Sequence, residues 1–189
     1  MAFEDYKTKE SVVVVYTGEG KGKTSASIGL MARALGSGWK VAYIQFIKHW
    51  NVGEHAFIHK IEPLFGESLL FVKGGRGFYK AGDISAAGVS DQEHKQSAKR
   101  TLELAMKATV SGSYDLVICD EINNAVKNKL IPKNAIAQLI ENRSKKTSLC
   151  LTGRDFPKEF LPLVDIATDM TKLRHHFDNK YLANKGIDF

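Results

Sequence analysis

A short glycine-rich stretch, Thr17-Gly18-Glu19-Gly20-Lys21-Gly22-Lys23-Thr24, constrains the fold of this chain more than any other part of the sequence. It follows an apolar run over 12–15 and precedes a helical pattern over 25–35, which is the context of a phosphate-binding loop of Walker A type. Glycines let backbone N–H groups converge on an anion, and the N-terminus of the following helix favours negative charge. Lys23 can reach phosphate oxygens, and the Thr24 hydroxyl suits magnesium. We expect a nucleoside triphosphate to contact Gly18, Glu19, Gly20, Lys21, Gly22, Lys23, Thr24 and Ser25.

The loop departs from the general Walker A pattern at its start. Only three residues separate Gly18 from Gly22, and Thr17 stands where the first glycine of the general pattern would be. The other interpretation is a glycine-rich turn that only joins a strand to a helix, and it requires the flanking pattern and the Lys-Thr ending to be coincidental. We therefore expect a triphosphate site that holds the phosphates in a non-standard way.

The composition is that of a single globular domain. The chain has 189 residues, of which 43% are hydrophobic and 25% charged, so we expect one domain over 1–189. No apolar run approaches the ~20 residues that cross a bilayer, and the charged start is unlike a signal peptide, so no membrane contact is expected. Cys119 and Cys150 each lie in an apolar, strand-like run, which indicates small core residues rather than a disulfide or a metal site. These features together predict a cytoplasmic protein.

The net charge is positive, but the basic residues are not clustered along the sequence. The formal net charge is +6, yet the 27 basic residues are scattered and form no run longer than a pair such as Lys145-Lys146. A charge of this size is usually a solvated surface, and a polyphosphate ligand accounts for the rest. We therefore expect no nucleic-acid partner, because such a partner needs a basic stripe or stacking aromatic residues on one face.

Strand-like and helix-like segments alternate along the chain, which predicts an α/β fold with a mainly parallel sheet and helices on both faces. Ser90-Asp91-Gln92-Glu93 has the pattern of a capping box at a helix start. Pro132 and Pro157 fit the first turns of the last two helices. The predicted strands are 11–17, 41–47, 69–73, 115–120, 147–152 and 164–168, and the predicted helices are 23–36, 54–62, 91–110, 133–143 and 157–163.

Ligands bind at the carboxyl ends of the strands in such sheets. Besides the phosphate loop, the segments that follow strands are 45–48, 120–121 and 152–154. Arg154 in the last of them either contacts phosphate or makes a surface ion pair.

Asp120 is the expected metal ligand at this edge. It ends the apolar run 116–119, as a Walker B acid ends a strand that faces a magnesium shell, although an acid in this place is otherwise often a helix N-cap. With a phosphate loop upstream, we favour the metal interpretation and expect Thr24, Asp120 and Glu121 to hold magnesium or manganese. Glu121 is either a direct ligand or a group that positions water.

Three further features allow two interpretations each. His55 and His59 have the i, i+4 spacing of zinc ligands, but without a third ligand an exposed polar helix face is favoured. The segment 174–178 (Arg-His-His-Phe-Asp) is either part of a site or an anchor for the tail. Phe78 and Tyr79, in a glycine-rich loop, either fill the core or offer a surface to a ligand.

Taken together, the motifs resemble the P-loop type of ATP:corrinoid adenosyltransferases. The matching pieces keep their order from 11 to 189, and the shortened phosphate loop is what this family carries. They are 17–24, Gln45-Phe46-Ile47-Lys48, Gly53-Glu54, Gly77-Phe78, Asp120-Glu121-Ile122-Asn123, Leu151-Thr152-Gly153-Arg154, His176-Phe177-Asp178 and Lys185-Gly186-Ile187-Asp188-Phe189.

The resemblance implies a RecA-like P-loop NTPase fold, a homodimer, and transfer of the 5′-deoxyadenosyl group of ATP to a reduced cob(I) corrinoid with release of triphosphate. Lys23, Lys21, the loop amides and magnesium would stabilise the leaving triphosphate, and the nucleotide would be held in the reverse of the usual orientation. Phe78 matches an aromatic residue that helps to remove the lower ligand of cobalt. The family commonly has tryptophan two residues later, where this chain has Lys80. A flavoprotein reductant is an implied partner.

Several other functions are considered. A conventional P-loop NTP hydrolase or small-molecule kinase would use the usual nucleotide orientation, but Asn128-Lys129 is followed by Leu130 and Ile131, so the guanine-specific Asn-Lys-x-Asp code is absent from the sequence. A nucleic-acid-dependent ATPase is favoured by the basic charge alone. A non-catalytic corrinoid carrier would have no need of a triphosphate loop. The preferred corrinoid, and synthesis as against salvage, are left open by the sequence.

Overall fold

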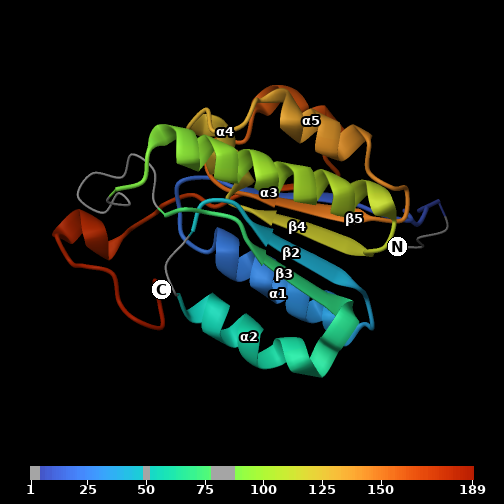
Figure 1. The fold of residues 1–189 in the computed structure, drawn as a ribbon, viewed down its shortest axis with the longest axis horizontal. Coiled ribbons are helices and arrows are strands. Elements are labelled where there is room, and N and C mark those ends of the chain that lie inside the picture. The colour runs from blue at the N-terminus through green and yellow to red at the C-terminus, as the bar shows by residue number, and fades with distance from the viewer. Residues whose placement is uncertain (1–4, 49–51, 78–87) are drawn as a thin grey trace.

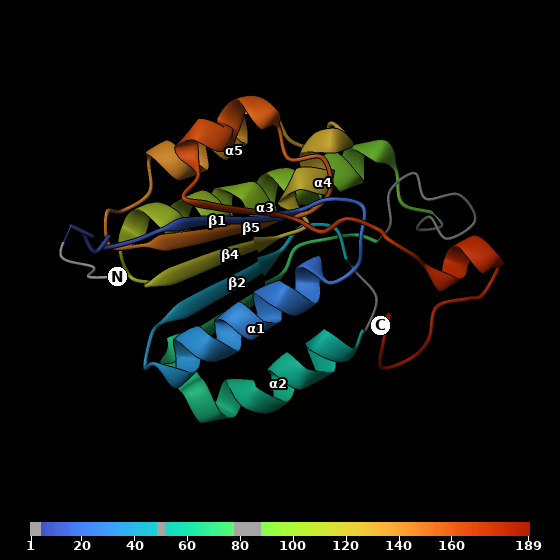
Figure 2. The ribbon, with the colours of Figure 1, turned by 180° about the vertical axis from the view of Figure 1, so that it is seen from behind.

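All strand pairs in the described part of the chain are parallel. A computed structural model describes residues 5–48, 52–77 and 88–189, and in it six strands form one sheet in the order β3-β2-β4-β5-β1-β6 (Figure 1). Helices cover both faces, which confirms the predicted α/β architecture (Figures 1 and 2). The strand before the phosphate loop, β1, is separated by β5 from the strand that ends in Asp120, β4, in the RecA-like arrangement.

All six predicted strands are present, and their ends differ from the prediction by at most two residues. The largest shifts are at the starts of β1 and β6 and at the end of β2. The strands are β1 (Val13–Thr17), β2 (Val41–Gln45), β3 (Leu69–Lys73), β4 (Leu116–Asp120), β5 (Ser148–Thr152) and β6 (Ile166–Asp169).

The helices match the prediction less closely. α3 begins with the expected capping box, in which the Ser90 hydroxyl accepts from the Glu93 N–H and the Glu93 carboxylate accepts from the Ser90 N–H. α2 continues three residues past its predicted end and contains Pro63, which lies in the last turn of the helix. The helices are α1 (Lys23–Gly36), α2 (Gly53–Phe65), α3 (Asp91–Ser111), α4 (Ile122–Lys127) and α5 (Asn134–Glu141), with 3-10 turns η1 (Gly66–Ser68), η3 (Lys158–Leu163) and η4 (His176–Asn179).

The placing of two prolines in first helical turns was wrong, and so was the type of one predicted helix. The segment predicted as a helix over 157–163 is the 3-10 turn η3, whose N-cap is Pro157 and which contains Pro162, a residue without an N–H for an α-helical bond. α5 begins at Asn134, two residues after Pro132, and the Ala135 N–H donates to the Pro132 carbonyl in the preceding turn. Both prolines thus lie just outside the first helical turn.

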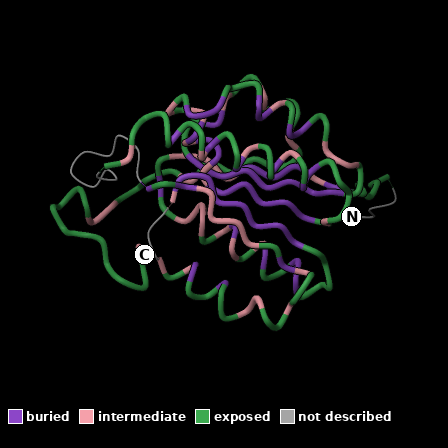
Figure 3. Tube along the Cα trace, in the orientation of Figure 1, coloured by how far each residue is buried: buried purple, intermediate pink, exposed green. Residues whose placement is uncertain are grey.

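The sheet separates two apolar cores (Figure 3). On one face the strands pack against α3, α4 and α5, and on the other against α1 and α2, where Met31 and Ile58 are fully buried. Successive strand residues point to opposite faces, so strands covered on both sides are apolar throughout. Cys119 belongs to the first core and Cys150 to the second, and both are buried free thiols, as predicted. Over the described ranges, no helix is long and apolar enough to cross a membrane.

The capping box at the start of α3 gives the first testable prediction. Replacing Ser90 with Ala removes the acceptor for the Glu93 N–H, so we expect the free energy of unfolding to fall by about 1 kcal/mol. Urea denaturation should show a lower midpoint with an unchanged slope. Ser113→Ala, at an exposed position after α3, is the control. An equal effect of the two substitutions would contradict a stabilising cap.

Candidate functional site

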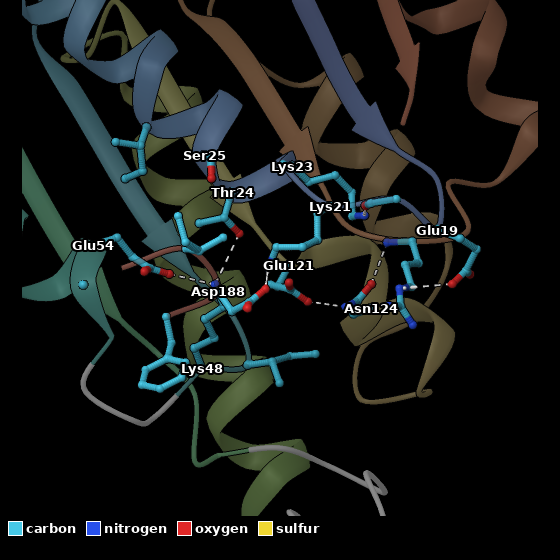
Figure 4. Close-up of a pocket in the computed structure, with 18 of the residues that line it drawn as sticks. Glu19, Lys21, Lys23, Thr24, Ser25, Lys48, Glu54, Glu121, Asn124 and Asp188 are labelled. Carbon is cyan, nitrogen blue, oxygen red and sulfur yellow. Dashed lines mark hydrogen bonds and ion pairs between the residues drawn. The ribbon is translucent and has the colours of Figure 1, made fainter. Parts of the chain in front are cut away.

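A cleft of about 960 Å³ opens at the carboxyl ends of the strands (Figure 4). The phosphate loop and the start of α1 form one wall, the segments after β2, β4 and β5 form the floor, and the C-terminal tail closes the far side. Its lining residues are Glu19, Gly20, Lys21, Gly22, Lys23, Thr24, Ser25, Ile28, Ile47, Lys48, Gly53, Glu54, Glu121, Asn124, Lys127, Asn128, Arg154, His175, Phe177, Gly186, Ile187, Asp188 and Phe189. The segments that the sequence placed at strand ends therefore meet in one cleft.

The phosphate loop curls around the ammonium of Lys23. Gly18 and Gly22 have φ angles of 98° and 109°, a conformation that favours glycine, and Gly22 is the N-cap of α1. The Lys23 Nζ donates to the carbonyl oxygens of Gly18 and Gly20, each at 2.6 Å. Burial lowers the pKa of Lys23, and the nearby Arg154 guanidinium lowers it further. The loop thus concentrates positive charge, which an anionic ligand would stabilise.

The chain just after β6 packs directly on this loop. The Met170 N–H donates to the Thr17 carbonyl at 2.8 Å, and the Gly20 N–H donates to the Met170 carbonyl at 2.6 Å. A Cβ on Gly20 would lie 2.5 Å from the Met170 oxygen, and one on Gly18 would lie 2.7 Å from the same atom. Thr17 is the last residue of β1 and pairs with Asp169 of β6, so the curled loop begins only at Gly18. This pairing explains why threonine is tolerated where the general pattern has glycine.

The two outer charges of the loop have partners from distant segments. Lys21 forms an ion pair with Asp188 of the tail, whose carboxylate also accepts from the Asn184 N–H at 2.6 Å. That backbone hydrogen bond, and then Lys21, lower the pKa of Asp188. Glu19 lies 3.3 Å from Nε of Arg154, and both side chains are about half exposed. Arg154 is thus in the cleft and also in a surface ion pair, so both interpretations of it agree with its position.

Asp120 is fully buried at the end of β4 and is surrounded by donors. The Thr152 hydroxyl donates to its Oδ1 at 2.6 Å, and the Gln45 amide donates to its Oδ2 at 2.8 Å. The Thr24 hydroxyl lies 3.2 and 3.3 Å from the two oxygens. A carboxylate beside a hydroxyl at the mouth of a phosphate loop is a set of oxygen ligands suited to Mg²⁺, which needs only one or two carboxylates besides phosphate oxygens. The oxygen atoms of Asp120 and Thr24 are therefore suitable ligands for the predicted magnesium ion.

Glu121, not Asp120, occupies the N-cap position of α4, so the N-cap interpretation of Asp120 is wrong. Glu121 has a φ of 64°, and its N–H donates to the Thr152 hydroxyl at 2.9 Å. Its carboxylate accepts from the Asn124 side-chain amide. Burial and then the Asp120 charge raise the pKa of Glu121 to about 7. An acid that lines the cleft beside a buried second acid favours a cation between them and the loop.

Lys48 and Glu54 line the cleft, although the sequence assigned neither residue a role in binding or catalysis. Their side chains form an ion pair at 2.7 Å, and the Lys48 Nζ lies 3.3 Å from the Thr24 hydroxyl (Figure 4). Burial lowers the pKa of Lys48, but Asp120 and Glu54 outweigh it, so the net pKa is raised. Lys48 follows a predicted strand, and this position could have identified it as a residue of the site. For the tail residues that line the cleft, Asp188 among them, the family resemblance was the indication that the sequence offered.

Some expectations are corrected or lie outside the described structure. His55 is buried rather than on an exposed polar face, because its ring contacts Phe71 and its Nε2 bonds Gln45. His59 is largely exposed beside Glu62. Of the residues that the structure describes, no three His, Cys, Asp or Glu side chains are grouped to hold a metal, so this pair lacks a third ligand. Phe78, Tyr79 and Lys80 lie outside the described residues.

The sheet order, the curled loop and Asp120 facing Thr24 define a P-loop nucleotide-binding protein of the RecA-like type. The sequence profile of the family described as ATP:corrinoid adenosyltransferase BtuR/CobO/CobP matches residues 9–189, and the chain belongs to this family.

Curated relatives agree with this assignment. The chain is 31% identical to a corrinoid adenosyltransferase of Escherichia coli (strain K12) over 96% of this chain and 87% of that protein. It is 30% identical to a corrinoid adenosyltransferase of Pseudomonas aeruginosa over 97% of this chain and 86% of the relative. The corrinoid adenosyltransferase CobA of Salmonella typhimurium is 29% identical, over 96% and 87% respectively. Each match spans nearly the whole chain.

The contact between the loop and the chain after β6 can be tested with two glycines. Gly20→Ala forces a Cβ against the Met170 carbonyl, so we expect the free energy of unfolding to fall by about 1–3 kcal/mol and ATP to bind more weakly. Gly29→Ala is the matched control, since a Cβ there meets nothing within 4 Å and helix α1 should gain about 0.5–1 kcal/mol. Denaturation and calorimetric titration with ATP measure both effects. Wild-type behaviour of Gly20→Ala would show that the close approach is not required.

Proposed function

We propose that this protein transfers the 5′-deoxyadenosyl group of ATP to the cobalt of a reduced cob(I) corrinoid, with release of triphosphate. The observation that carries the proposal is the family match over 9–189, which includes an intact phosphate loop facing Asp120. The names of the relatives, corrinoid adenosyltransferases, do not favour the alternative of a conventional P-loop NTP hydrolase or small-molecule kinase.

The reaction needs little covalent chemistry from the protein. The cobalt lone pair of cob(I) attacks the 5′ carbon of ATP, a cobalt–carbon bond forms, and the carbon–oxygen bond breaks with its electron pair on triphosphate. Because cob(I) is itself a strong nucleophile, a general base is not required. The protein contributes by positioning both substrates and by stabilising the charge of the leaving group. Lys23, Lys21 and the amides of residues 18–25 supply that stabilisation.

Thr24, Asp120 and Glu121 would hold magnesium or manganese beside the triphosphate. The support is the distance of 3.2 Å between the Thr24 hydroxyl and Asp120, together with the close placement of two acids. The bound ion supplies neutralisation of phosphate charge. Arg154 lies in the cleft near Lys23 and is proposed as a further phosphate contact. Its backbone is fixed at this place by the hydrogen bond from the main-chain N–H of Arg154 to the Asn124 side-chain oxygen at 2.6 Å.

The nucleotide is proposed to lie reversed, with the loop around its terminal phosphate and its 5′ carbon toward the corrinoid. The support is the shortened loop, which begins at Gly18 because Thr17 is held in β1. Phe78 is proposed to contact the corrinoid and help to remove the lower ligand of cobalt, on the strength of the family resemblance.

The wider setting is also proposed from the family. One adenosyltransferase domain over 1–189, a cytoplasmic location, a flavoprotein reductant and a homodimer are the expected properties. A dimer is supported by the exposed apolar side chains of the tail, which two copies could cover. These are Leu173, Phe177, Tyr181, Leu182 and Ile187.

Product analysis separates this function from the NTP hydrolase. With ATP, magnesium and chemically reduced corrinoid, we expect intact tripolyphosphate and a light-sensitive cobalt–carbon adduct in equal amounts. Visible spectroscopy follows the adduct, and phosphorus NMR identifies the phosphate product. Without corrinoid, neither product should accumulate. Steady release of ADP and orthophosphate without corrinoid would favour the hydrolase instead.

Lys23 tests the phosphate loop itself. Lys23→Ala removes a charged donor to the triphosphate, which should cost about 2–4 kcal/mol of transition-state stabilisation and leave roughly a few per cent of the wild-type rate or less. Circular dichroism should show an unchanged fold. Lys133→Ala, which breaks only an exposed ion pair with Glu159, is the control and should remain fully active. Near-normal turnover of Lys23→Ala would remove this loop from the mechanism.

A further inference from the structure

A buried chain of side-chain hydrogen bonds leads from α2 to Asp120. Gln45 ends β2 and is the register partner of Asp120 on the neighbouring strand β4, so both side chains leave the same face of the sheet. His55, in the first turn of α2, reaches Gln45 from the far side: its Nε2 lies 2.5 Å from the Gln45 Oε1. All three residues are at most 2% exposed.

The direction of each hydrogen bond between His55, Gln45 and Asp120 follows from which of their groups can donate. An ionised Asp120 only accepts, so the Gln45 atom at 2.8 Å from its Oδ2 must be the amide nitrogen. The Gln45 oxygen then faces His55 and can only accept, so His55 must carry its proton on Nε2 and donate. Each donor therefore points toward Asp120, and the Gln45 amide satisfies both neighbours in this orientation but not when its nitrogen and oxygen are exchanged.

The remaining surroundings of Asp120 show what this chain orients. Thr152 donates to Oδ1 and Gln45 to Oδ2, from opposite sides of the carboxylate. Each Asp120 oxygen can still accept a further contact, and the Thr24 hydroxyl lies 3.2 and 3.3 Å from the two oxygens. A carboxylate held from both sides keeps one rotation about its Cβ–Cγ bond, and that rotation aims it at the mouth of the phosphate loop.

The His55 ring is itself held in place by packing. It lies 5.7 Å from the ring of Phe71, centroid to centroid, and its Nδ1 is buried without a hydrogen-bond partner among the described residues. A buried polar nitrogen left without a partner carries a free-energy cost. A simple apolar residue would fill the same space without that cost, so the donor on Nε2 is the feature that a hydrophobic replacement would lose.

We propose that His55 is a positioning residue that acts through Gln45 to fix the orientation of Asp120 for magnesium. The proposal rests on the magnesium role assigned to Asp120 above. Without the His55 donor, the Gln45 oxygen is buried and unsatisfied, and its amide is free to turn that oxygen toward Asp120, where it repels the carboxylate. Partners that orient a metal ligand typically contribute 10–100-fold to metal affinity.

The measurement is the dissociation constant for ATP by calorimetry, with saturating Mg²⁺ and again with EDTA. The ratio of the two constants reports how well the protein coordinates the ion beside the nucleotide, independently of turnover. His55→Leu keeps the volume and removes the donor. His55→Gln restores an amide donor at the reach of Nε2. His59→Leu, one turn along α2 at a largely exposed position that also contacts Phe71, is the matched control.

We expect His55→Leu to reduce the Mg²⁺-dependent gain in ATP affinity by about tenfold or more, with little change in EDTA. His55→Gln should retain most of the gain, and His59→Leu all of it. If His55→Leu fails to fold by circular dichroism, Gln45→Met removes the same link and should show the same selective loss.

Two results would overturn the inference. An unchanged Mg²⁺-dependent gain in a folded His55→Leu or Gln45→Met protein would reject the positioning role alone. A wild-type protein whose ATP affinity does not respond to Mg²⁺ would reject the positioning role together with the magnesium site. Neither result bears on the proposed adenosyl transfer, which the product analysis tests separately.

Discussion

The buried carboxylate of Asp120 is the charge around which this end of the sheet is organised. Burying a carboxylate is costly unless donors surround it, and here the donors come from β2, β5 and the start of α1. Those three elements reach the same point only because the strand order places β4 between β2 and β5, with α1 beside them. The strand order therefore determines which groups surround the Asp120 carboxylate. A sheet in which β2 and β5 did not flank β4 would remove the Gln45 and Thr152 donors from it.

The sequence predicted well the features that depend on local patterns. Six mainly apolar runs predicted six strands, and Ser90 with Glu93 predicted the cap of α3, because strand and cap signals lie within a few neighbouring residues. The phosphate loop was recognisable for the same reason. Helix type and exact starts were harder, since Pro157 and Pro162 permit a 3-10 turn where the apolar pattern suggested an α-helix.

Contacts between distant segments are what the sequence could not supply. His55 was expected on an exposed helix face because the sequence offered no third metal ligand for it and His59, yet its environment is set by Gln45 and Phe71 from two strands. The approach of the chain after β6 to Gly20, and of Asp188 to Lys21, brings together residues about 150 or more positions apart. These contacts convert an exposed glycine-rich loop into one wall of a cleft, and only a three-dimensional structure shows which residues form the other wall.

The two carbonyl groups that accept from Lys23 have a consequence for selectivity. The Lys23 ammonium has three N–H groups and donates two of them to the oxygens of Gly18 and Gly20, each at 2.6 Å, so an anion that takes more than the third N–H must exchange with these oxygens. In such an exchange the net gain is the difference between an ion–ion contact and two ion–dipole contacts, which is small for a neutral or weakly charged acceptor. The loop therefore favours a group with several negative charges, because such a group can engage the ammonium and the loop amides together and so offset the loss of both carbonyl contacts.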